Sequence, residues 1–136
     1  MIESTLQFCS QMQTDEGHFP TMADEDKNKA HCNVSFCHGA SGAISPFLSA
    51  ALLYEKLGNE EKAAEYVGVA LNAGEAVWSK GLLLKGNGLC HGITGNGYFL
   101  HSIARWYRLQ ENETESQKWE KRALLFCKAS SDYGVQ

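Results

Sequence analysis

Hydrophobic residues recur every three or four positions through most of the chain, which is the spacing of an amphipathic helix. The first long stretch covers residues 43–57, with Pro46 in its first turn, where a missing N–H costs little. Gly58 follows as a left-handed C-cap, and Asn59 then caps a second helix that ends at Gly81. The pattern therefore predicts two helices joined by a tight turn.

The same pattern restarts farther along the chain. A third helix is predicted around residues 98–107, and a fourth from the capping-box pair Thr114 and Gln117 to about Ser130. A short helix is also expected over residues 2–12. No segment has the alternation of a strand, so the predicted fold class is all-α.

An internal repeat relates the two helix pairs at a constant offset of 53 residues, from Cys37 to Cys90. Each unit is a loop, a helix, a tight turn and a second helix, and each begins with Cys-His-Gly-x-x-Gly. At this offset Cys37, His38, Gly39, Gly42, Ser49, Ala51, Tyr54, Asn59, Glu60, Ala70 and Leu71 pair with Cys90, His91, Gly92, Gly95, Ser102, Ala104, Tyr107, Asn112, Glu113, Ala123 and Leu124. An alignment that holds without a gap through both helices indicates a true repeat.

We expect one partial domain over residues 1–136, with repeat units at about 37–89 and 90–136. A helix and a polar stretch, residues 13–36, precede the first unit. Most of that stretch is interpreted as a surface connector. Because it is longer than the ~12–15 residues usual for a structureless connector, we expect part of it to line a functional site.

Composition and charge exclude several classes of function. A net charge of −4 argues against nucleic acid as the main partner. No apolar run approaches the ~20 residues of a transmembrane helix, and the N-terminus lacks the basic and apolar regions of a signal peptide. Five cysteines, an odd number without dense spacing, indicate reduced thiols and a cytoplasmic location.

The two Cys-His-Gly loops carry the candidate chemistry. Each loop precedes a helix, whose positive end favours a thiolate, and equivalent positions of adjacent repeats bring Cys37 and Cys90 close together. Two sulfurs and one imidazole suit zinc, and three protein ligands leave a fourth position open, as in catalytic or substrate-binding zinc sites. The residues alone do not decide between His38 and His91 as the third ligand.

Other candidate residues have ordinary interpretations. Cys9 and Cys127 lie on helix faces next to Phe and are interpreted as small buried hydrophobes. Cys32 is interpreted as a free thiol, and His18, His31 and His101 as loop or surface histidines. Lys85, five residues before Cys90, is either a solvated lysine or an anion-binding group beside the thiolates.

Two motifs resemble the lanthionine synthetase C-like family. "FCHGASG" resembles the family's W-C-H-G-A-P-G, and "KGNGLCHGITGNGYFL" resembles its K-G-x-G-L-C-H-G-x-x-G-N-x-Y. The histidine of the first motif is typical of eukaryotic-type members. The resemblance implies an α/α toroid of helical hairpins, incomplete in this chain, with a single zinc ion held by Cys37, Cys90 and His91. It also implies that Lys85 lies at a glutathione site.

The resemblance further implies a reaction. Zinc activates the thiol of glutathione or of a peptide cysteine, which adds to a dehydroamino-acid peptide and forms a thioether. A nearby acid must then protonate the enolate. Peripheral association with the plasma membrane is an expectation for the parent family.

The chain departs from the family in ways that bear on its function. Phe36 replaces Trp and Ser41 replaces Pro in the first motif. We expect a C-terminal-half fragment of a longer protein, without the repeats that carry the family's acid–base histidine and aspartate, so the sequence assigns no catalytic residue. The alternative function is a non-catalytic, zinc-containing adaptor that binds glutathione or a peptide. An α/α-toroid glycosidase ranks last, because the loops lack its paired carboxylates.

Overall fold

The computed structural model describes residues 2–27 and 33–133. Within these ranges the chain forms five α-helices, α1 (Ile2–Gln11), α2 (Ala40–Lys56), α3 (Glu60–Lys80), α4 (Ile93–Leu109) and α5 (Glu113–Asp132), and no β-strand. The all-α prediction is confirmed. No helix in the described part of the chain combines the length and hydropathy needed to cross a membrane.

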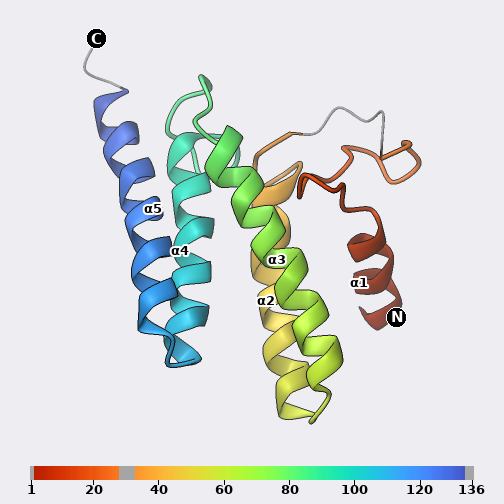
Figure 1. Cartoon of the computed structure of the whole chain (residues 1–136). Coiled ribbons are helices and arrows are strands. Elements are labelled where there is room, and N and C mark those ends of the chain that lie inside the picture. The colour runs from red at the N-terminus through yellow and green to blue at the C-terminus, as the bar shows by residue number, and fades with distance from the viewer. Residues whose placement is uncertain (1, 28–32, 134–136) are drawn as a thin grey trace.

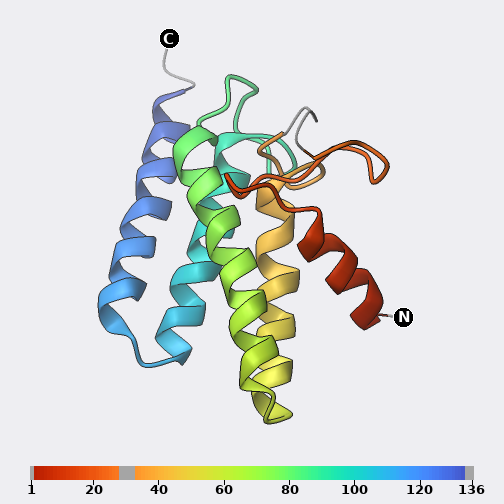
Figure 2. The same cartoon turned by 45° about the vertical axis from the view of Figure 1, so that its right-hand side comes forward.

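The helices form two antiparallel hairpins, α2–α3 and α4–α5, that stand side by side (Figure 1). Helix α4 contacts both α2 and α3, and α1 lies beside α2 on the side away from α5 (Figure 2). The loops before α2 and α4 both lie at one end of the molecule, at the top of Figures 1 and 2. Two successive hairpins in this arrangement form an open part of an α/α toroid, as expected.

The two turns within the hairpins obey the predicted repeat. Asn59 and Asn112 are both N-caps, and each side chain accepts a hydrogen bond from the backbone N–H three residues later. Gly58 has a φ of +73°, and Glu111, at the equivalent position of the second repeat, has a φ of +55°. The repeat therefore preserves backbone conformation even where the residue type changes.

Three predicted helix starts differ from the structure. The third helix, expected around residues 98–107, begins at Ile93. The fourth helix begins at Glu113 with Asn112 as its cap, and the Gln117 side chain bonds Glu113 instead of closing a box with Thr114. Helix α2 begins at Ala40, so Pro46 lies inside the helix, where it removes one N–H from the hydrogen-bond ladder. Asn112 caps α5 through its side chain, whereas the N-cap of α2, Gly39, makes no side-chain cap hydrogen bond.

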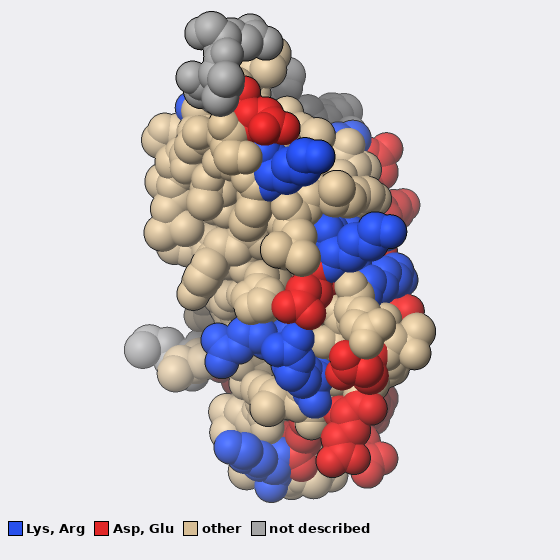
Figure 3. Space-filling view, turned by 90° about the vertical axis from the view of Figure 1, so that its left-hand side faces the viewer, with Lys and Arg blue, Asp and Glu red and all other residues tan. Residues whose placement is uncertain are grey.

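One continuous core joins the hairpins. The largest fully buried side chains come from all four long helices: Trp119, Tyr66, Phe126, Ile44, Leu100, Ile103 and Val77. Gly74 permits a close approach between hairpins, since a Cβ there would lie 2.3 Å from Ile103 Cδ1. On the face that α5 presents, basic and acidic side chains alternate (Figure 3), and Arg122 pairs with Glu75 across the helices.

The segment before the first repeat packs more closely than a surface connector. His18, interpreted as a loop or surface histidine, lies in a loop but is only 4% exposed. Gly17 lies against α3, where an added Cβ would be 2.1 Å from the Asn72 carbonyl oxygen. The Gln13 side chain donates to the Val69 carbonyl oxygen of the same helix at 2.9 Å. Residues 13–18 are therefore part of the folded unit.

Burial of His18 predicts a pH-dependent stability. Burial, and then the charge of Lys80, lower the pKa of His18, although Glu16 opposes them. Below the unfolded-state pKa of about 6.5, the unfolded chain takes up a proton that the folded chain does not, so stability falls. We expect the urea midpoint to drop between pH 7.5 and 5.5 more for the wild type than for His18→Gln. Equal drops in the urea midpoint for the two proteins would mean that His18 does not cause the loss of stability at low pH.

Candidate metal centre

Three potential metal ligands meet where the two repeat loops come together. Cys37 comes from the loop before α2, and Cys90 and His91 come from the loop before α4. One ligand atom of each residue lies within 4.8 Å of the other two, and all three side chains are exposed. Ligands of one tetrahedral zinc lie about 3.5–4 Å apart, so the donor set and its spacing fit a zinc ion after a small adjustment.

The backbone holds the two loops together. The Phe36 N–H donates to the Cys90 carbonyl oxygen at 2.9 Å, which links the residue before one cysteine to the other cysteine. Within each repeat the loop also lies directly on the first turn of its helix. A Cβ at Gly42 would be 2.1 Å from the Phe36 carbonyl oxygen, and one at Gly95 would be 1.9 Å from that of Leu89. The second glycine of each motif thus has the same steric role.

A buried asparagine connects the surrounding segments; it belongs to the second family motif, but the sequence assigned it no role. Asn96 lies in α4, is 1% exposed, and donates from Nδ2 to the carbonyl oxygens of Val34 and Gly81. Its Oδ1 accepts from the Ser41 hydroxyl at the start of α2. Two signals in the sequence point to it: the asparagine of the second family motif, and the apolar Ala43 at the equivalent position of the first repeat.

Comparison with known proteins agrees with this arrangement. The family model of the "Lanthionine synthetase C-like protein" matches residues 1–135. The chain belongs to this family. Over 134 residues it is 28% identical to a Danio rerio protein named "Glutathione S-transferase LANCL1", covering 98% of this chain and 29% of that protein. Over 127 residues it is 30% identical to the Arabidopsis thaliana "LanC-like protein GCL1", covering 93% of this chain and 25% of that protein.

Membership of the lanthionine synthetase C-like family confirms the resemblance that the two motifs carry. The chain spans less than a third of the length of either relative. The helical hairpins described above are therefore the part of the family fold that this chain provides.

The two thiols of the centre affect each other's ionisation. Hydrogen bonding with Cys90, and then with Ser35, lowers the pKa of Cys37. The contact with Cys37, followed by burial, raises the pKa of Cys90. Ser35 Oγ lies 3.8 Å from Cys37 Sγ and donates to the His38 carbonyl oxygen at 2.9 Å, which fixes the loop around the thiol. Of the two cysteines, Cys37 therefore loses its proton first.

A shallow hollow of about 580 Å³ opens beside the cluster. Lys85 lines it together with Cys37 and His91, so the lysine singled out from the sequence lies next to the candidate ligands. His38 lines the same hollow, but within the described ranges it is not part of the ligand cluster. Asn33 and Ser35 complete the lining, which is polar and carries a cationic side chain.

Other candidate residues lie elsewhere. Cys9 is half-buried, whereas Cys127 is exposed on α5, so its interpretation as a buried hydrophobe is wrong. His101 is half-buried on α4. His31 and Cys32 lie outside the described residues.

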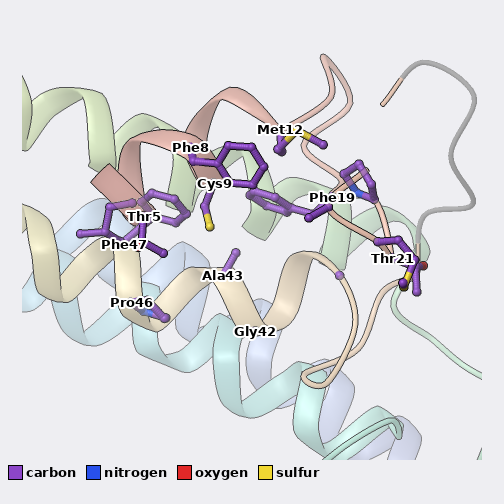
Figure 4. A pocket seen from close by; sticks show the side chains of 15 residues that line it. Thr5, Phe8, Cys9, Met12, Phe19, Thr21, Gly42, Ala43, Pro46 and Phe47 are labelled. Carbon is purple, nitrogen blue, oxygen red and sulfur yellow. The ribbon is translucent and has the colours of Figure 1, made fainter. Parts of the chain in front are cut away.

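An apolar groove of about 460 Å³ between α1 and α2 is separate from this centre (Figure 4). Figure 4 shows the Cys9 sulfur directed toward Ala43 of α2. Apart from this thiol the lining carries no titratable side chain. The groove is therefore a poor candidate for acid–base or metal chemistry.

Proposed function

We propose that this chain carries a zinc centre that activates a thiol, that of glutathione or of a peptide cysteine, for addition to a dehydroamino acid. The main support is the convergence of Cys37, Cys90 and His91 from two loops 53 residues apart, at the edge of a hollow that also contains Lys85. The name of the Danio rerio relative, a glutathione S-transferase, supports glutathione as the thiol.

Cys37, Cys90 and His91 would hold the ion, because two sulfurs and one imidazole are a donor set that zinc prefers. Zinc bound there would lower the pKa of a thiol in its open coordination position. The two Cys-His-Gly loops precede helices α2 and α4, whose positive ends favour anionic sulfur. The protein thus places the positive end of a helix beside each of the two cysteines.

The hollow beside the ligands suits a small anionic thiol compound. Glutathione carries two carboxylates, and the exposed Lys85 ammonium offers a complementary charge. The exposed Asn33 side chain adds hydrogen-bonding groups on the opposite loop. We therefore assign Lys85 to orientation of the substrate carboxylate and the ligand cluster to its sulfur.

Proton balance limits what the lining residues can do. The thiol loses its proton, its sulfur bonds to the β-carbon of the dehydroamino acid, and the α-carbon must then gain a proton. Outside the ligand cluster, Lys85 and His38 are the side chains of the described lining that can donate one. The lining therefore contains two candidate proton donors. The alternative function is that of a non-catalytic adaptor that binds zinc and glutathione without forming a thioether.

The decisive experiment incubates the zinc-loaded chain with glutathione and a dehydroalanine peptide and measures the thioether by mass spectrometry. We expect product, and we expect Lys85→Ala to weaken glutathione binding about fivefold, the effect of an exposed ion pair worth about 1 kcal/mol. Lys56→Ala is the matched control, because Lys56 lies at the other end of α2 and should leave binding unchanged.

Each other outcome has a distinct meaning. Binding of zinc and glutathione without thioether would favour the adaptor over the enzyme. Equal glutathione affinities for Lys85→Ala and Lys56→Ala would remove Lys85 from the site. Failure of the wild type to bind either zinc or glutathione would contradict both functions.

A further inference from the structure

The amide of Asn96 lies between the two halves of the candidate centre. Asn96 is in the first turn of α4, six residues after Cys90 and within the same repeat unit as His91. Nδ2 donates to the Val34 carbonyl oxygen at 3.0 Å, and Val34 precedes Cys37 by three residues in the other loop. One side chain therefore joins the segment of Cys37 to the helix that follows Cys90 and His91.

The contacts of Asn96 fix the orientation of its amide. Nδ2 also donates to the Gly81 carbonyl oxygen at 2.8 Å, and Oδ1 accepts from the Ser41 hydroxyl. Two carbonyl oxygens on one side require the NH₂ group there, and the hydroxyl on the other side requires the oxygen. Since Asn96 is 1% exposed, water cannot replace any of these bonds without opening the core.

We propose that Asn96 is a positioning residue of the metal centre, setting the separation of Cys37 from Cys90 and His91; this inference rests on the metal centre proposed above. Among the residues that the structure describes, two hydrogen bonds join the loop of Cys37 to the second repeat, the Asn96 bond to Val34 and the Phe36 N–H bond to the Cys90 carbonyl oxygen. The Phe36 ring also stacks on Phe99 of α4, with the ring centroids 5.2 Å apart. Of these contacts, the Asn96 bond is the one made by a buried polar side chain, and its loss frees the Val34 carbonyl three residues before the exposed thiol.

Asparagine is required at this position for a chemical reason. Aspartate has the same shape, but its carboxylate cannot donate, and it would place oxygen against the carbonyl oxygens of Val34 and Gly81. Asn96→Asp should therefore release the Cys37 loop while changing the packing volume very little. Ser41→Ala should have a smaller effect, because it removes the contact to Oδ1 and keeps both donations from Nδ2.

The test compares zinc affinity and the cobalt absorption spectrum of wild type, Asn96→Asp, Ser41→Ala and a control, Ser116→Ala. Ser116 donates a buried hydrogen bond to the Ala104 carbonyl oxygen, so its loss weakens the core without touching either loop. We expect Asn96→Asp to weaken zinc binding about 10–100-fold, as loss of an outer-shell contact does, with altered thiolate-to-cobalt bands. Ser116→Ala should remain within about twofold of wild type.

A second measurement does not depend on metal. In the zinc-free chain, diamide should link Cys37 and Cys90 in a disulfide several-fold more slowly in Asn96→Asp than in Ser116→Ala. If the wild type binds no zinc, this rate still decides whether Asn96 positions the thiols, and only the proposed function fails. If Asn96→Asp does not fold, Ser41→Ala is compared with Ser116→Ala instead. Equal zinc affinities, cobalt spectra and linking rates in the folded variants would overturn the inference.

Discussion

Cys90→Ala is expected to reduce the zinc content of the purified chain from about one ion to almost none. Cys90 supplies one of the two sulfurs of the cluster, and its removal leaves one thiol and one imidazole facing the hollow. Loss of a direct ligand should cost more than the roughly 10–100-fold in affinity that loss of an outer-shell contact costs. Elemental analysis after dialysis, and competition with a chromophoric chelator, measure the effect.

Controls within the chain make this test specific. Cys127→Ala removes an exposed thiol on α5 and should leave zinc content unchanged. His91→Ala should lose zinc and His38→Ala should keep it, since only His91 belongs to the ligand cluster within the described residues. Zinc retained by Cys90→Ala, or lost from His38→Ala but not from His91→Ala, would refute the assigned ligand set.

The repeat explains how much of the fold could be predicted from the sequence. The offset that pairs Cys37 with Cys90 also pairs Asn59 with Asn112, and the structure uses both asparagines as N-caps. The Thr114–Gln117 pair is a stronger local signal for a helix start, yet it is wrong. The internal repeat predicts the helix start more accurately, because equivalent units must begin and end at equivalent positions in order to stack regularly.

Features that depend on contacts between segments could not be predicted in the same way. His18 lies in a stretch of polar residues, yet it is buried where the neighbouring Gly17 packs against α3. Asn96 bonds to residues 15 and 62 positions away along the sequence. Local periodicity reports which face of a helix is apolar, but it does not reveal which distant carbonyl groups need a buried donor.

The residues of the candidate centre stand out in the sequence more clearly than the contacts that support them. The sequence places Cys37, Cys90 and one histidine together through symmetry alone, whereas the choice of His91 came from family resemblance. In the structure the same choice has a geometric counterpart, since His91 and not His38 falls within 4.8 Å of both sulfurs in the described part of the chain. Positions that are identical in both repeats, such as Cys37 and Cys90, include the candidate ligands. Asn96, which differs from its equivalent Ala43, makes the hydrogen bonds that support them.

Gly95→Ala is expected to destabilise the chain by about 2–3 kcal/mol, the usual cost of overpacking a rigid site. The added methyl would lie 1.9 Å from the Leu89 carbonyl oxygen and 2.7 Å from the Leu89 carbonyl carbon, and backbone atoms cannot rotate away as a side chain can. The loop must therefore move off the first turn of α4. Urea unfolding followed by circular dichroism measures the change in free energy.

Gly68→Ala supplies the matched control, because Gly68 is also inside a helix but an added methyl meets nothing within 4 Å. There the substitution should stabilise the chain by about 0.5–1 kcal/mol through helix propensity. The changes in the free energy of unfolding should therefore have opposite signs in the two variants. This difference separates a steric contact from a general effect of replacing glycine. Since Leu89 directly precedes Cys90, folded Gly95→Ala should also bind zinc more weakly than Gly68→Ala. A Gly95→Ala chain as stable as Gly68→Ala would mean that the loop does not rest on α4, and the close approach that brings Cys90 to Cys37 would have to arise in another way.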